Sequence, residues 1–155
     1  MSYKSKTKVD PEVFFMGAIM HDLGLTDPYD KGNTFELDGA VAAMSISENL
    51  GMSKENAELI HEMVALHNSV GIAHKLAPEI ALLHYGAGAD VAGLWIEDLH
   101  PKTIREIISE YPRDNFKEGM IRLIADQMDK KPFSYMSTLM DLGFEKKIAT
   151  APFKE

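Results

Sequence analysis

The stretch FFMGAIMHDLGL, residues 14–25, decides how this sequence is interpreted. Its apolar run reaches the pair His21-Asp22 and continues beyond it, so two polar side chains interrupt what is otherwise core. A buried charge needs a partner or a metal ion, and the negative partial charge at a helix end helps to hold a cation nearby. The pattern also allows a plainer interpretation, in which Asp22 is a polar helix stop and His21 a hydrogen-bonded core imidazole.

The residues before this stretch form a helix start. Asp10 suits the N-cap, Pro11 the first helical position and Glu12 the first turn. We therefore predict a helix over residues 11–22, preceded by a polar N-terminal tail over residues 1–10.

The rest of the sequence is predicted to be helical. After a loop rich in Gly, Asp and Thr over residues 23–34, apolar positions recur at helical spacing, and no segment alternates strictly. The further helices are expected over residues 36–50, 53–67, 78–91, 101–110, 114–130 and 134–141. The prediction is an all-α fold, a compact bundle of about six to seven helices, with residues 11–155 as a single domain.

Composition narrows the function classes. The chain has no Cys and a net charge of -8, from 24 acidic and 16 basic residues. A metal must then be held by His, carboxylate, carbonyl or water, and nucleic acid is not an expected partner. No apolar run approaches the ~18 residues of a membrane span, and we expect no secretory signal. We expect a soluble cytoplasmic protein acting on a small molecule, with homo-oligomerisation left open.

Two further residues are candidates for chemistry. Asp90 follows the almost wholly apolar or small run 80–89, where a carboxylate is a candidate metal ligand. Gly86 and Gly88 each cost roughly 1 kcal/mol relative to Ala inside a helix, which we interpret as close approach by another backbone or a metal cage. His67 ends a predicted helix at the start of a polar loop, although a His in that place is often only a partner of the helix dipole.

The remaining histidines are assigned structural places. His74 is expected at the surface, His84 in the core and His100 at a helix cap. His61-Glu62 does not make a zinc protease motif, since Ala65 stands where its second His is required.

Four blocks in order carry a family resemblance: FFMGAIMHDLGLT of residues 14–26, FELDGA of 35–40, VALH of 64–67 and LHYGAGADVAG of 83–93. With them the chain resembles the HD-domain superfamily, and within it the cyanamide hydratase-like branch. The resemblance covers roughly residues 11 to 142.

The resemblance implies a helical HD-type domain that holds one divalent metal ion, zinc first, with iron, manganese or magnesium as alternatives. His21, Asp22 and Asp90 match three of four ligand positions. Asp22 and His67 are the implied catalytic proton carriers. The implied substrate-binding residues are Glu36, His67, Asn68 and Thr26.

The implied activity is that of a hydratase or hydrolase of a small nitrile- or amide-like molecule, using metal-activated water. Two alternatives stay open: an HD phosphohydrolase acting on a nucleotide or small phosphate ester, and a binding or oligomerising module with a degenerate metal site. Phosphate esters favour nearby Arg or Lys, and only Lys31 and Lys75 stand near the candidate residues in sequence, which favours an uncharged substrate.

The family's first metal ligand is a His on an upstream helix, and residues 1–20 contain no His. Three explanations stay open: that helix lies outside this chain, another residue such as His61 replaces the ligand, or the site is degenerate.

Overall fold

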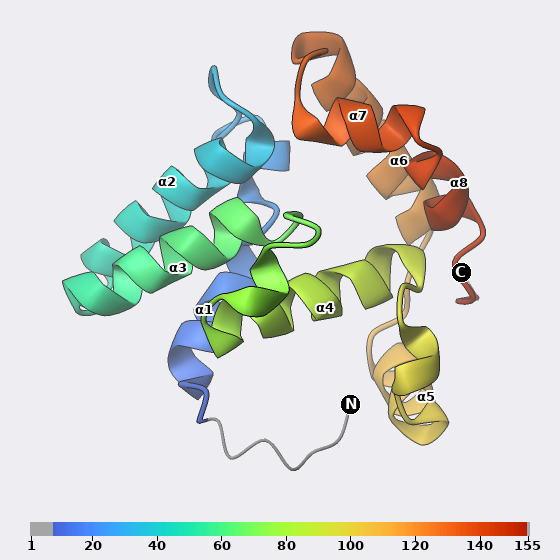
Figure 1. Ribbon diagram of the computed structural model, residues 1–155, viewed down its shortest axis with the longest axis horizontal. Coiled ribbons are helices and arrows are strands. Elements are labelled where there is room, and N and C mark those ends of the chain that lie inside the picture. The colour runs from blue at the N-terminus through green and yellow to red at the C-terminus, as the bar shows by residue number, and fades with distance from the viewer. Residues whose placement is uncertain (1–7, 155) are drawn as a thin grey trace. The chain divides into compact units, whose positions relative to one another are not determined.

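The computed structural model describes residues 8–154, and within them the chain is entirely helical, with no strand (Figure 1). The all-α prediction is confirmed. The α-helices are α1 Pro11–Met20, α2 Phe35–Asn49, α3 Lys54–Leu66, α4 Pro78–Ala92, α5 Pro101–Glu110, α6 Phe116–Lys130, α7 Tyr135–Asp141 and α8 Phe144–Ala149. Three short 3-10 helices are η1 Leu23–Leu25, η2 Ala73–Lys75 and η3 Ile96–Asp98. Among the α-helices of the described residues, only the six-residue α8 has no counterpart in the prediction, and the three 3-10 helices lie in segments predicted as loops.

The described residues divide into two compact units, 8–87 and 88–154. The boundary falls inside α4. The expectation that residues 11–155 form a single domain stays a prediction, and the expected tail over 1–10 lies mostly outside the described residues.

In the first unit, α1 begins as predicted. The Asp10 side chain accepts hydrogen bonds from the backbone amides of Glu12 at 2.9 Å and Val13 at 3.2 Å, which satisfies donors that a helix start leaves unpaired. The helix ends at Met20 rather than at residue 22, with His21 as its C-cap. The chain therefore turns at the polar pair and does not carry it along a helix face.

The core of this unit lies where α1, α2 and α3 pack together. Val13 from α1, Ala40 from α2 and Ile60 from α3 are almost fully buried in one hydrophobic cluster. The helices α2 and α3 run side by side (Figure 1). Gly51, with φ of 87°, follows the end of α2 in the left-handed conformation that favours glycine, and the side chain of Ser53 caps α3.

A close approach of backbones joins η1 to α2. A Cβ added at Gly24 would meet the carbonyl group of Phe35 and the amide nitrogen of Gly39. Only a residue without a side chain allows this approach, which holds the turn after Asp22 against the start of α2.

In the second unit, Arg113 ties three segments together. Its guanidinium lies over the rings of Phe116 at 4.4 Å and Phe153 at 4.6 Å, and it donates to the Asp90 carboxylate at 2.6 Å and to the Asp90 carbonyl at 3.0 Å. Such stacked, forked contacts are specific to arginine. They fix the end of α4 relative to α6 and the C-terminal segment.

The close backbone approach expected at the two α4 glycines is not found among the described residues. A Cβ at Gly88 would meet the Trp95 ring, and one at Gly86 would meet nothing within 4 Å among the described residues. The aromatic side chain of Trp95 accounts for Gly88, and no contact of the described residues accounts for Gly86.

Within residues 8–154, no helix is both long and apolar enough to cross a membrane.

The close approach at Gly24 predicts that Gly24→Ala destabilises the protein by about 3 kcal/mol, because neither contacting backbone can move away cheaply. Urea unfolding followed by circular dichroism measures this loss. Gly86→Ala is the matched control: it adds a methyl group in open space within a helix and should stabilise the protein by up to about 1 kcal/mol. Equal stability of Gly24→Ala and the wild type would contradict the packing described.

Candidate metal centre

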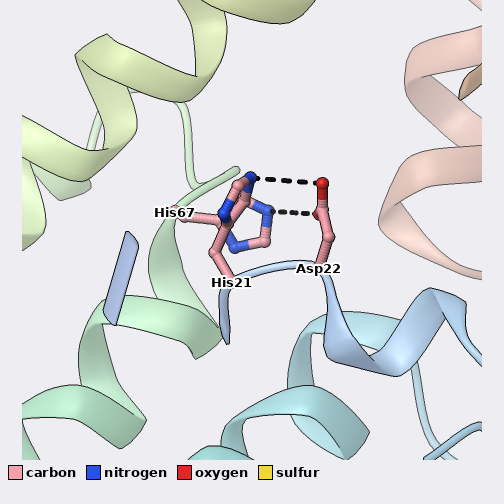
Figure 2. A group of neighbouring side chains, drawn as sticks. All are labelled: His21, Asp22 and His67. Carbon is pink, nitrogen blue, oxygen red and sulfur yellow. Dashed lines mark ion pairs between the residues drawn. The ribbon is translucent and has the colours of Figure 1, made fainter. Parts of the chain in front are cut away.

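Three side chains from two helix ends meet in the first unit (Figure 2). His21 is the C-cap of α1, Asp22 begins the following turn, and His67 is the C-cap of α3. His21 Nε2 lies 3.1 Å from Asp22 Oδ2, and His67 Nε2 lies 3.7 Å from Asp22 Oδ1. One potential ligand atom of each residue lies within 4.8 Å of the others. The two imidazoles therefore face the two oxygens of one carboxylate.

The same local geometry orients both rings. Each histidine ends a helix in the right-handed helical conformation, and its Nδ1 lies against the carbonyl oxygen three residues earlier, Ala18 at 2.8 Å and Val64 at 2.6 Å. A carbonyl oxygen only accepts, so Nδ1 carries the hydrogen in both rings. The Nε2 atoms of the neutral rings then present lone pairs toward Asp22. Metal-binding histidines are typically held in this way.

Three electron-pair donors at this spacing repel one another unless a positive charge lies among them. That charge is a proton on an imidazole or a metal cation. Burial lowers the pKa of His67 below its ordinary value of 6.5 and outweighs the opposing charge of Asp22, so a proton on this ring is disfavoured. His21 is less buried, with 23% of its side chain exposed, and can carry the proton when no metal is bound.

Asp22 stays ionised. Burial acts to raise its pKa, but the hydrogen bond and the charge of His21 bring the pKa below its ordinary value of 3.8. An anionic oxygen and two imidazole nitrogens together make a ligand set suited to a divalent ion.

The side chains of His84 and Phe35 hold His67 in place. The ring of His84 is buried in the core, as predicted, and its Nδ1 donates to the backbone carbonyl of His67 at 2.6 Å. The ring of Phe35 lies edge-on to His67, with centroids 5.8 Å apart. These contacts hold the end of α3, and with it the His67 ring.

Glu36 and Asn68 directly follow Phe35 and His67 in the sequence and pair with each other. Glu36 is 5% exposed, and its Oε1 accepts from the Asn68 side-chain amide at 3.3 Å. Its negative charge acts on His67, where it opposes the lowering of that pKa. Two of the predicted substrate-binding residues are thus paired next to the third, His67.

The other predicted residues are not members of the three-residue group. Thr26 is exposed, and its hydroxyl donates to the Leu23 carbonyl at 2.7 Å. Asp90 belongs to the second unit and is paired there with Arg113, so its role as a ligand stays a prediction. His61 is half-buried on α3 and is not part of the three-residue group.

For two histidines the structure shows a place or a contact that the sequence did not predict. His67 was expected as a catalytic and substrate-binding residue and lies in the ligand group itself. His84 was assigned to the core only, because nothing in its spacing points to a carbonyl 17 residues away. His74 is exposed and His100 caps α5 by accepting from Lys102, as predicted.

Comparison with known proteins gives one relationship. No family model matches the chain. Two proteins of Saccharomyces cerevisiae, the cyanamide hydratases DDI2 and DDI3, are each 22% identical to it over 148 residues. The chain is similar to cyanamide hydratases. The match covers 94% of this chain and 65% of each relative, so the chain spans less than two thirds of their length. The wider HD-domain assignment stays a prediction.

The lowered pKa of His67 predicts acid sensitivity of the metal-free protein. As pH falls below about 6.5, the unfolded chain gains a proton at this position that the folded protein resists. Folding stability should therefore be complete above that pH and decline below it, by up to about 1.4 kcal/mol per pH unit for one proton. Urea unfolding between pH 7.5 and 5.5, with chelator present, measures this slope.

His67→Gln should reduce the slope, because the titrating ring is gone. His74→Gln, which removes an exposed imidazole, is the control for losing a histidine as such. An unchanged slope in His67→Gln would show that burial of this ring does not set the acid sensitivity.

Proposed function

We propose that this chain is a metal-dependent hydratase of a small, neutral, nitrile- or amide-like molecule, with cyanamide as the first compound to test. The observation that carries the proposal is the arrangement of two imidazole Nε2 atoms around one carboxylate. The similarity to two cyanamide hydratases supports the choice of reaction.

The donor set fits a divalent ion. His21, Asp22 and His67 would hold it, and the two carbonyl-bound Nδ1 atoms already select the tautomer that ligation requires. With nitrogen and oxygen donors and no thiolate, zinc is the first choice, and iron, manganese or magnesium are alternatives. Asp90 is proposed as a further ligand.

When bound, such an ion lowers the pKa of water to about 7, which makes a hydroxide nucleophile available at neutral pH. In the hydration of cyanamide, a bond forms between the water oxygen and the nitrile carbon, and one π bond between carbon and nitrogen breaks. One proton leaves the water and one is delivered to the nitrile nitrogen, which gives isourea. Transfer of the remaining O–H proton to the same nitrogen then converts the C=N bond to C–N as the C=O bond forms, which yields urea. Asp22 and His67 are the groups proposed to carry these protons.

The charge of the site favours a neutral substrate over a phosphate ester. Asp22 and Glu36 contribute two negative charges, which a divalent ion only balances. Lys31 and Lys75, the basic residues nearest in sequence, are exposed. An anionic ester would thus find no surplus positive charge among these residues to bind it.

Protein purified without chelator or added metal should contain one equivalent of divalent metal and convert cyanamide to urea. His21→Ala and His67→Ala should each lose most of the metal and the metal-dependent rise in melting temperature, since each removes one ligand. Elemental analysis, thermal unfolding and a urea assay measure the three quantities, and His74→Ala is the control for loss of a histidine.

The outcomes separate the alternatives. Absence of stoichiometric metal, together with an unchanged melting temperature in His21→Ala, would contradict the metal site and favour a binding module. Turnover of a generic phosphate ester but not of cyanamide would favour a phosphohydrolase.

The proposed role of Asp90 is tested by separating its carboxylate from its ion pair. Asp90→Asn should weaken metal binding by about a hundredfold or more, because losing a ligand costs more than the 10–100-fold typical of outer partners. Arg113→Met breaks the same ion pair but keeps the carboxylate, so it should lower stability and retain metal. Full metal content in Asp90→Asn would exclude Asp90 as a ligand.

A further inference from the structure

The helix α5 segregates apolar from polar side chains although it buries none of its residues. Its apolar side chains recur at helical spacing and form one stripe along the helix and its C-cap, called here the α5 stripe: Ile104, Ile107, Ile108 and Tyr111. A helix normally carries such a stripe to bury it against another element. In the second unit, α6, α7 and α8 each contribute buried residues, whereas α5 contributes none.

The α5 stripe is only partly covered by the described residues. Ile107 is 54% exposed and Tyr111 71% exposed, while Ile104 and Ile108 are half-buried. Isoleucine is a poor helix former because its branched side chain is restricted in a helix. Three isoleucines in one short helix therefore weaken it unless packing offsets the loss. A contiguous exposed apolar surface of this kind marks an interaction site.

The charges beside the α5 stripe indicate which partner covers it. Arg105 projects about 110° to one side of the centre of the stripe, and Glu110 about 110° to the other. Lys102 and Glu106 lie on the opposite side of the helix, where they pair with each other at 3.6 Å. Two parallel copies of α5 related by a twofold axis would place the Arg105 flank of each beside the Glu110 flank of the other. A second copy of this chain therefore complements both the apolar stripe and its flanking charges.

A lipid surface is less suited to the same helix. Helices that lie on membranes carry a polar face rich in Lys and Arg, which attracts anionic lipids. The polar face of α5 has two basic and two acidic residues, and the whole chain has a net charge of -8. This charge balance favours a protein partner.

We propose that the α5 stripe is an interface between two copies of this chain, in which the two α5 helices lie side by side and parallel. One pair of short helices is small for an interface, so we expect a Kd in roughly the micromolar to millimolar range. The interface contains no residue of the candidate metal centre. Its failure would therefore leave the proposed function untouched.

Sedimentation equilibrium of the full chain from about 1 µM to about 1 mM tests the association. The apparent mass should rise with concentration from the 17.3 kDa of one chain toward twice that value. Ile107→Glu should raise the Kd about 30-fold or more, because it places a carboxylate at the centre of the apolar contact in both copies. A single-chain mass throughout, or an unchanged Kd in Ile107→Glu, overturns the proposal.

Val41→Glu is the matched control. Val41 is a branched apolar residue of another helix, α2, and is 56% exposed, close to the value for Ile107. It should leave the Kd within about twofold of wild type. Circular dichroism shows whether each variant is folded. Equal weakening by Val41→Glu and Ile107→Glu would contradict the assignment to α5. Flotation with phosphatidylserine-containing vesicles by a chain that stays monomeric would assign the stripe to lipid instead.

Charge reversal tests the proposed arrangement of the two helices. Arg105→Glu and Glu110→Arg should each raise the Kd about 3- to 10-fold, because each sets like charges against each other on both sides of the pair. The double variant restores opposite charges and should return the Kd to within about threefold of wild type. Additive weakening in the double variant would contradict the charge matching.

Single thiols report the direction of the helices, because the chain has no Cys of its own. Ile104→Cys and Tyr111→Cys lie at the two ends of the stripe. In a parallel pair, each variant should form a disulfide with its own counterpart under mild oxidation. In an antiparallel pair, equivalent end residues lie about 10 Å apart along the helix axis, beyond the reach of a disulfide. A disulfide that forms only when the two variants are mixed would therefore overturn the parallel arrangement.

Discussion

The candidate centre depends on two hydrogen bonds between a histidine Nδ1 and a helix-end carbonyl oxygen, at Ala18 and at Val64. Each bond uses a carbonyl that the end of a helix leaves unpaired, so the backbone gains a donor while the ring gains an orientation. Because both bonds are made by Nδ1, both rings turn Nε2 toward Asp22. Backbone carbonyls at the ends of α1 and α3 therefore orient both imidazole rings.

The ends of α1 and α3 lie close together because small residues allow close packing around them. Gly24 lets the turn after Asp22 lie directly against the backbone of α2, and Gly17 leaves room for the Met63 side chain between α1 and α3. His84 then fixes the end of α3 from α4. The precision of the centre therefore comes from backbone contacts within the first unit, where closely packed atoms resist displacement.

Local signals in the sequence predicted most of the fold. Asp10, Pro11 and Glu12 correctly marked the start of α1, because capping depends on neighbouring residues alone. The six-residue α8 was missed, since so short a helix carries too few periodic positions. For the site, His21-Asp22 was recognised as a point of chemistry. The hydrogen bonds from Arg113 to Asp90 and from His84 to His67 join residues 23 and 17 positions apart, so no local spacing indicates them.

The charges of the three candidate ligands suit metal binding, whereas the neighbouring Glu36 adds a negative charge that metal binding does not require. Ligation is favoured by the ionised Asp22 and by a His67 that burial keeps neutral, whereas Glu36 adds a second negative charge that the proposed ligand set does not need. The proposed divalent ion would balance the negative charges of both carboxylates. Little positive electrostatic potential would then remain to attract an anion. Selectivity must then come from hydrogen bonding, which discriminates strongly in a buried site because a mismatched partner leaves a polar group unpaired.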